Sequence, residues 1–140
     1  GSNSAVDWHR AAQSCGNRIL AVCPNWLIIV EGVETNDGAT WSWWGANLRG
    51  VNSIPVVLNK PEKLVYSPHE YGPAIYSQWW FHNGNFTYDS LVNEHWYPTW
   101  LYIYDSPNAK PLMMGEWGGR EYDTTSASGR WFNALISLIC

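Results

Sequence analysis

The chain has 140 residues, of which 46% are hydrophobic and 14% are charged, and its net charge is -4. This length suits one ordinary domain with a sizeable core, and the composition excludes wholesale disorder. The chain has no basic stripe and no apolar run of the roughly 18 residues that a membrane helix needs, so we expect neither nucleic-acid binding nor membrane insertion.

The first part of the chain predicts a helix, a strand and a long loop. Apolar residues recur at helical spacing over residues 6–22, which predicts an amphipathic helix with Asp7 or Ser4 as its N-cap. The unbroken apolar run at residues 26–30 is typical of a strand buried on both faces. A loop rich in Gly, Asn, Asp and Trp follows, and residues 46–50 predict a short helix.

The second part of the chain adds two strands and two helices. We expect strands at residues 63–67 and 112–115, and between them a helix at residues 91–104 that Pro98 breaks or restarts. Residues 126–140 carry an apolar face at helical spacing and predict a final amphipathic helix. Because helices alternate with strands and no linker or repeat interrupts them, the chain is expected to form one α/β unit with parallel strands.

Side chains able to do chemistry stand where the predicted strands end. Glu31 follows the first strand, His69 and Tyr71 follow the second, and Glu116 follows the third. Functional residues of parallel α/β folds gather at these carboxyl ends. Residues two apart in extended chain point to the same side, so His69 and Tyr71 either face one ligand or carboxylate together or are simply packed and satisfied. Glu116 is either a catalytic carboxylate or a strand-end acid that is solvated or paired with Arg120.

Tryptophan is the strongest compositional anomaly, with 11 residues. Indole faces stack on sugar rings, so the loop Trp41-Ser42-Trp43-Trp44-Gly45 suggests either a sugar-binding platform or a hydrophobic plug. Glycoside hydrolysis with retention needs two carboxyl groups about 5–5.5 Å apart, and Glu31 is a second strand-end acid. Its neighbour Val30 offers no amide to orient a sugar hydroxyl, so Glu31 is the weaker candidate for an acid/base.

The three cysteines, Cys15, Cys23 and Cys140, form no CxxC pair and have no histidine at metal-ligand spacing, so no metal site is expected. We interpret them as small buried hydrophobic residues, with a disulfide to a partner outside the chain as the alternative. The triplet Asn85-Phe86-Thr87 is a glycosylation acceptor and is compatible with secretion.

Five segments come in the order and approximate spacing seen in family 5 glycoside hydrolases. They are LIIVEGV at residues 27–33, WWGANL at residues 43–48, PVVLN at residues 55–59, LVYSPHEY at residues 64–71 and MGEWG at residues 114–118. The chain most resembles the secreted endo-β-1,4-glucanases of that family, and the resemblance covers nearly all of residues 1–140. It implies a (β/α)8 TIM barrel, no cofactor, an extracellular location, and β-glucan polysaccharide or cello-oligosaccharide as the substrate.

The resemblance also implies roles for single residues. Glu116 resembles the nucleophile at the end of barrel strand 7. His69 and Tyr71 resemble the pair at the end of strand 6, where the tyrosine lies close to the nucleophile. The sugar-binding aromatic residues that the resemblance implies are Trp43 or Trp44, after strand 5, and Trp117, directly after the nucleophile.

The chain departs from the family pattern at the second catalytic carboxylate. The family's acid/base glutamate lies in an Asn-Glu-Pro motif at the end of strand 4, but the only Asn-Glu here is Asn93-Glu94, which is followed by His95. The strand-8 tryptophan and the upstream Arg and His are also absent. We therefore expect about half of a barrel of roughly 250 residues, from helix 4 to helix 7, which is completed by a missing barrel half or by a second copy of the chain. The alternative is a non-catalytic β-glucan-binding or self-assembling partial barrel.

Overall fold

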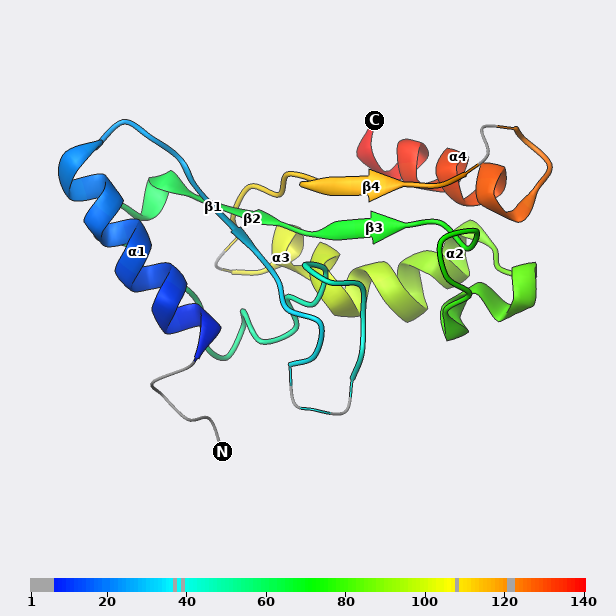
Figure 1. The fold of residues 1–140 in the computed structure, drawn as a ribbon, viewed down its shortest axis with the longest axis horizontal. Coiled ribbons are helices and arrows are strands. Elements are labelled where there is room, and N and C mark those ends of the chain that lie inside the picture. Colours follow the sequence, from blue (N-terminus) through cyan, green and yellow to red (C-terminus); the bar gives the residue numbers. More distant parts are fainter. Residues whose placement is uncertain (1–6, 37, 39, 108, 121–122) are drawn as a thin grey trace.

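The computed structural model describes residues 7–36, 38, 40–107, 109–120 and 123–140. Helices lie alongside a layer of short parallel strands (Figure 1). The elements, in chain order, are α1 (Trp8–Val22), β1 (Ile28–Glu31), a 3-10 turn (Pro61–Lys63), β2 (Leu64–Ser67), β3 (His69–Tyr71), a second 3-10 segment (Trp79–Gly84), α2 (Tyr88–Ser90), the π-helix η3 (Leu91–Leu101), α3 (Tyr102–Asp105), β4 (Glu116–Gly118) and α4 (Ala127–Ile139).

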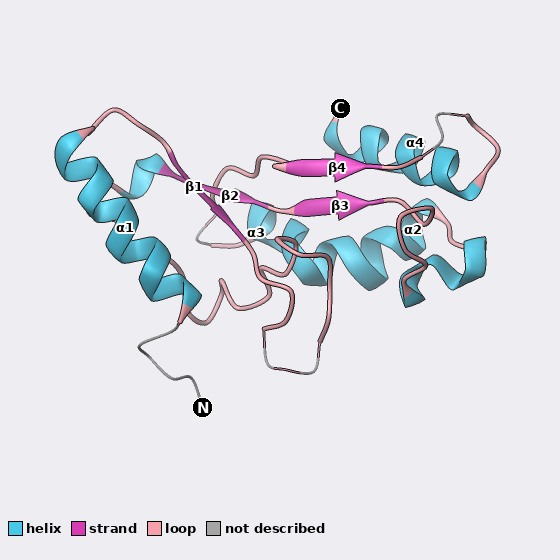
Figure 2. Cartoon of the chain, viewed as in Figure 1, coloured by secondary structure: helices cyan, strands magenta, loops and turns pink. Residues whose placement is uncertain are grey.

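The strands are all paired in parallel. β1 pairs with β2 from Ile28 and Leu64 onward, and β3 pairs with β4 with His69 opposite Glu116. Only Pro68 separates β2 from β3, and the two run on in one direction in Figure 2. The predicted mixed α/β architecture with parallel strands is therefore confirmed. β1 and β2 end at Glu31 and Ser67, next to the point where β3 and β4 begin.

Helix α1 agrees with the helix predicted at residues 6–22. Its buried residues are Ala12, Gly16 and Leu20, which recur every fourth position and so form one face. Gly16 is needed on that face because a Cβ there would lie 2.8 Å from the Leu58 side chain. Asp7 is at the N-cap position but makes no capping hydrogen bond with its side chain, and Ser4 lies outside the described residues.

Strand β1 corrects the prediction of a strand buried on both faces. Ile28 and Val30 are 8% and 4% exposed, whereas Leu27 and Ile29 are 57% and 49% exposed. Side chains alternate along a strand, so only one face of β1 packs into the described core.

The helix predicted at residues 91–104 is present, but the prediction that Pro98 breaks it is wrong. The helical region runs from α2 through η3 to α3, and Pro98 lies inside η3. A π-helix bonds residue i to residue i+5 and not to i+4, which changes the carbonyl that the proline ring faces. The region begins at a capping box between Thr87 and Ser90.

Two short predicted elements are also corrected. Residues 46–50 form turns and not a helix, because Asn47 is bridged antiparallel to Val33. Of the strand predicted at residues 112–115, only Leu112 makes a bridge, to Tyr66, and the regular strand begins later at Glu116. The strand at residues 63–67 and the helix at residues 126–140 are confirmed as β2 and α4.

Five of the 11 tryptophans are buried in the core: Trp43, Trp80, Trp96, Trp100 and Trp131. The largest fully buried side chains include Trp80, Trp96, Trp131, Tyr66 and Phe81. The cysteines do not join this core: Cys15 and Cys140 are exposed and Cys23 is half-buried, so their interpretation as buried residues is wrong. Within the described part of the chain, no helix is both long and apolar enough to span a membrane.

Candidate active site

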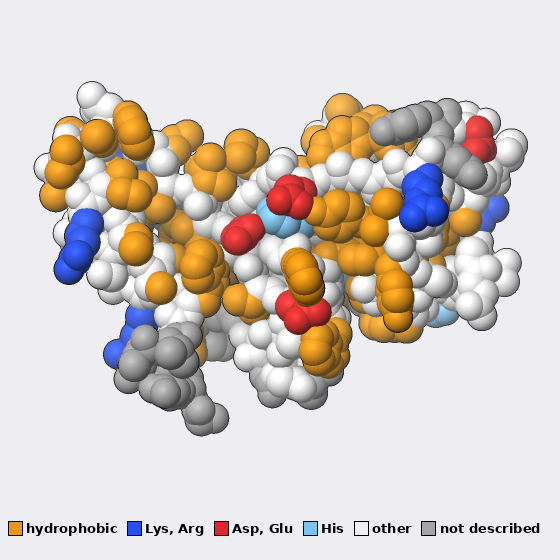
Figure 3. Space-filling view, in the orientation of Figure 1, with side chains coloured by type: hydrophobic (Ala, Val, Ile, Leu, Met, Phe, Trp, Pro, Cys, Tyr) orange, Lys and Arg blue, Asp and Glu red, His pale blue; other side chains and the backbone are white. Residues whose placement is uncertain are grey.

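A cleft of about 850 Å³ opens where β1 and β2 end and β3 and β4 begin. Its lining includes Glu31, the last residue of β1, and Tyr71, the last residue of β3. It also includes His69 and Glu116, the first residues of β3 and β4, so Glu116 begins a strand and does not follow one as predicted. Acidic side chains gather around a histidine in the middle of this face, with hydrophobic side chains beside them (Figure 3). The parallel register of β3 and β4, with His69 opposite Glu116, explains why residues 47 positions apart in the sequence meet here.

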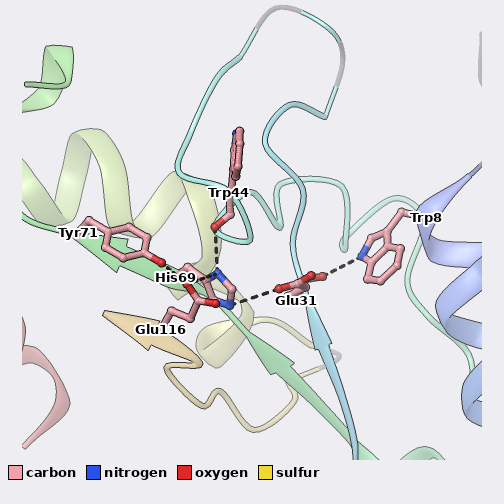
Figure 4. Close-up of polar contacts among 6 residues, drawn as sticks. All are labelled: Trp8, Glu31, Trp44, His69, Tyr71 and Glu116. Carbon is pink, nitrogen blue, oxygen red and sulfur yellow. Dashed lines mark hydrogen bonds and ion pairs between the residues drawn. The ribbon is translucent and has the colours of Figure 1, made fainter. Parts of the chain in front are cut away.

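Tyr71 and Glu116 are joined directly. The Tyr71 hydroxyl donates a hydrogen bond to Glu116 Oε2 (Figure 4). The pKa of Tyr71 is raised to about 12, first by burial, then by this hydrogen bond and by the negative charges of Glu116 and Glu31. The phenol therefore stays neutral and remains a hydrogen-bond donor at pH values well below 12.

His69 lies between the carboxylates of Glu31 and Glu116. Its Nδ1 is 3.0 Å from the carbonyl oxygen of Trp44, and because a carbonyl only accepts, Nδ1 carries the hydrogen. Nε2 is 3.4 Å from Glu31 Oε2, and Nδ1 is 3.8 Å from Glu116 Oε2. The backbone of Glu31 is held in turn by Trp8, whose Nε1 donates to the Glu31 carbonyl oxygen at 2.8 Å (Figure 4).

Two glycines leave room for the imidazole of His69. A Cβ on Gly45 would lie 2.2 Å from Nδ1, and a Cβ on Gly115 would lie 3.1 Å from Nε2 and 2.1 Å from Ser67 Oγ. The ring is therefore flanked by backbone from two separate loops and is only 7% exposed. Sequence patterns gave no sign of this, because neither glycine is near His69 in the chain.

The aromatic residues of the Trp-rich loop divide into two kinds. Trp43 is 7% exposed and packs edge-on against Tyr71, with 5.5 Å between ring centroids. Trp44 is 75% exposed and lines the cleft, so it has a free indole face. Trp117 stacks on Phe132 and is not among the residues that line the cleft.

Sequence reasoning did not single out two other aromatic residues at the cleft. Trp41 and Tyr76 line it and are 58% and 66% exposed. Trp41 belongs to the Trp-rich loop, whose composition predicted sugar binding for the loop as a whole but did not identify Trp41 as one of the residues involved. Tyr76 lies in the long aromatic loop after β3, and nothing in its sequence neighbourhood marks it.

The arrangement supports carboxylate chemistry on a polar ligand with flat faces. It combines an exposed glutamate held by a neutral phenol, a second carboxylate beyond the histidine, and exposed aromatic rings at the rim. Across the described residues, no group of three or more His, Cys, Asp and Glu side chains is placed to hold a metal ion.

Comparison with known proteins agrees with this chemistry. The family described as Cellulase (glycosyl hydrolase family 5) matches residues 1–138. An endoglucanase of Paenibacillus polymyxa is 48% identical over 139 residues, which cover 98% of the chain and 34% of that relative. A more distant relative, the major extracellular endoglucanase of Xanthomonas campestris, is 31% identical over 143 residues, which cover 98% of the chain and 28% of the relative.

Solved structures match over almost the whole chain. The endocellulase of Pyrococcus horikoshii, crystallised as a glutamate-to-alanine variant with cellotetraose, superposes with a TM-score of 0.80 at 36% identity. The match covers 99% of the chain and 38% of that endocellulase. The chain thus spans about a third of the relatives' length.

Proposed function

The chain belongs to glycosyl hydrolase family 5, the cellulase family, and we propose that it carries the nucleophile side of an endo-acting β-1,4-glucanase that retains configuration. The observation that carries the proposal is the carboxylate of Glu116, which accepts the Tyr71 hydrogen bond inside an aromatic-lined cleft. Glu116 attacks the anomeric carbon, the glycosidic oxygen leaves with its electron pair, and a glycosyl-enzyme ester forms.

Tyr71 and His69 hold the nucleophile in place. The Tyr71 hydroxyl donates a hydrogen bond to one oxygen of Glu116 and so holds the carboxylate in place. Because the pKa of Tyr71 is about 12, the phenol keeps its proton and this hydrogen bond is maintained. His69 bonds the Trp44 carbonyl through Nδ1, which ties the loop that carries the exposed Trp44 ring to the catalytic strand. Trp44 then stacks on a glucose ring in the cleft.

The second carboxylate lies outside this chain in the proposal. A retaining enzyme needs a general acid about 5–5.5 Å from its nucleophile, and the Asn-Glu-Pro motif of the family is absent from the sequence. We propose that further strands of a (β/α)8 barrel supply this acid and cover the exposed side chains of Leu27, just before β1, and Ile29 on β1. The complete enzyme is secreted and acts on β-glucan chains.

An activated substrate tests the nucleophile without the acid. The reagent is a dinitrophenyl β-cellobioside that carries fluorine on the carbon next to the anomeric carbon, and we call it the fluorinated cellobioside. Its dinitrophenolate leaving group departs without protonation. We expect the 140-residue chain to gain one fluorocellobiosyl group, located on Glu116 by peptide mass spectrometry, and the Glu116→Gln variant to gain none. Labelling at another residue, or no labelling of a folded chain, would refute the proposed role.

The exposed aromatic rings of the cleft favour a non-catalytic carbohydrate-binding unit as the second candidate. Affinity electrophoresis in a soluble β-glucan separates the two functions: retardation without labelling by the fluorinated cellobioside indicates binding alone. Rapid hydrolysis of soluble cellulose by the chain itself would require an acid within it, and Glu31→Gln would then be the first variant to make.

A further inference from the structure

A buried acid lies directly behind the candidate active site. Glu70 stands between His69 and Tyr71 on β3, so its side chain points to the opposite face of the strand. It is 0% exposed. Its Oε1 accepts a hydrogen bond of 2.8 Å from Trp100 Nε1 and lies 2.9 Å from His95 Nε2. These three side chains, Glu70, His95 and Trp100, form what we call the rear cluster.

The rear cluster accounts for the π-helix. His95 and Trp100 are five residues apart on η3 and both reach the same carboxylate. In an α-helix of 3.6 residues per turn, residues five apart point well away from each other. The i to i+5 pattern of a π-helix brings them to one side, and such rare segments are frequent at functional sites.

A chain of packed aromatic rings also links the rear cluster to Tyr71 in the candidate active site. The His95 imidazole stacks on Trp80, with 3.7 Å between centroids and 6° between planes. Trp80 meets Trp43 edge-on at 5.8 Å, and Trp43 meets Tyr71 edge-on at 5.5 Å. A shift of His95 would therefore be passed to the Tyr71 ring through two buried indoles.

Stability alone is a poor reason for this arrangement. A buried ion pair is often replaced by apolar side chains without loss of stability, because desolvation cancels most of the attraction. Strand β3 has only three residues and pairs only with β4 among the described strands, so its backbone ladder fixes it weakly. An anchor between His69 and Tyr71 would fix the direction in which both side chains leave the strand.

We propose that the rear cluster positions the catalytic strand: Glu70, held by His95 and Trp100, keeps the Tyr71 hydroxyl and the His69 ring aligned on Glu116. None of the three contacts the cleft, so they are positioning residues and not catalytic ones. The catalytic consequence rests on the proposed function, whereas the alignment of Tyr71 does not.

The test replaces the buried contact between Glu70 and His95 by apolar groups of similar shape. Glu70→Met combined with His95→Phe keeps the volume and the stack on Trp80, and Glu62→Gln, at an exposed acid outside the site, is the matched control. The first readout is the ionisation of Tyr71, followed by NMR of ¹³C-labelled tyrosine and assigned with Tyr71→Phe. The second is the rate at which the fluorinated cellobioside labels Glu116.

We expect the double variant to unfold cooperatively while the midpoint for Tyr71 falls from about 12 toward the ordinary tyrosine value of about 10. Labelling of Glu116 should slow by at least about tenfold, since small misplacements of catalytic groups are costly. A folded double variant with wild-type Tyr71 ionisation and labelling would overturn the proposal. If the wild-type chain is not labelled at all, the proposed function fails, but the Tyr71 readout still decides the positioning role.

Glu70→Gln keeps the test decisive if the double variant does not fold. Glutamine retains an oxygen for the Trp100 donor but removes the charge that faces His95. A smaller shift of the Tyr71 midpoint in the same direction supports the proposal, and an unchanged midpoint overturns it.

Discussion

Replacing Gly45 by alanine should displace the His69 ring. Gly45 has a φ of 83°, and its added Cβ would lie 2.2 Å from Nδ1, 2.5 Å from Cε1 and 2.6 Å from Cγ of His69. Ordinary van der Waals contact begins at 3.4 Å, so the ring or the loop must yield by about 1 Å. A displacement of that size breaks the 3.0 Å hydrogen bond between Nδ1 and the Trp44 carbonyl.

The expected cost has three parts. Overpacking a buried site costs about 1–3 kcal/mol, the lost hydrogen bond about 1 kcal/mol, and a side chain at positive φ about 1–2 kcal/mol. Gly38→Ala is the matched control, because Gly38 has a φ of 77° and nothing within 4 Å of the added Cβ. It carries the backbone strain alone, so Gly45→Ala should be less stable than Gly38→Ala by about 2–4 kcal/mol.

Urea unfolding followed by tryptophan fluorescence measures this difference in the free energy of unfolding. The labelling rate of Glu116 should fall about a hundredfold in Gly45→Ala and stay unchanged in Gly38→Ala, since a 1 Å misplacement near the chemistry has an effect of that order. If the two variants lose the same stability, the contact between Gly45 and His69 does not hold the ring, and the reasoning is wrong.

Three further variants separate roles at the site. Tyr71→Phe removes a hydrogen bond to a charged carboxylate worth about 1.5–3 kcal/mol, so labelling of Glu116 should slow roughly 10- to 100-fold, as quenched-flow mass spectrometry can measure. Trp44→Ala should weaken cello-oligosaccharide binding by about 1 kcal/mol in calorimetry with unchanged stability, whereas Trp43→Ala should cost about 3–5 kcal/mol of stability. The raised pKa of Tyr71 stabilises the fold fully below the ordinary tyrosine value, and this contribution is lost as pH rises from about 10 to about 12. Unfolding free energies over this window should therefore fall more steeply for the wild-type chain than for Tyr71→Phe, and equal slopes would contradict the assignment.

Local pattern was sufficient where an element packs through a single periodic face. Helices α1 and α4 and strand β2 were predicted with nearly correct bounds, because their apolar spacing reports the buried face directly. The α/β class followed from the alternation of elements. Strand β1 was misjudged because an unbroken apolar run does not say how many of its faces are covered, and Ile29 is left half exposed.

Long-range contacts account for most of the remaining differences. The proline rule predicted a break at Pro98, but the wider π-helix continues through it while His95 and Trp100 converge on Glu70. Residues 46–50 have helix-compatible composition, yet the bridge between Asn47 and Val33 holds the segment in turns. A carboxylate or a bridge contributed from elsewhere in the chain cannot be read from the local sequence.

The central residues of the site were predictable because the rule behind them is topological. Neighbouring parallel strands bring residues distant in the sequence side by side, and the two-residue period of a strand puts His69 and Tyr71 on the same face. The rule that site residues follow their strand did not hold for Glu116, which is the first residue of β4. The structure brings both close to Glu116. The sequence could not predict that Trp43 is buried while Trp44 is exposed, because adjacent residues of one loop differ only in what packs against them.

The glycines around His69 show two different reasons for the same residue type. Gly45 has positive φ, so a glycine would be favoured there even without the histidine. Gly115 does not have positive φ, so its backbone conformation is open to any residue, and only the Ser67 hydroxyl and the His69 ring require the missing side chain. The glycine before Glu116 is therefore not a turn residue. It leaves space for the imidazole beside Glu116, so the segment that carries Glu116 also determines where His69 can lie.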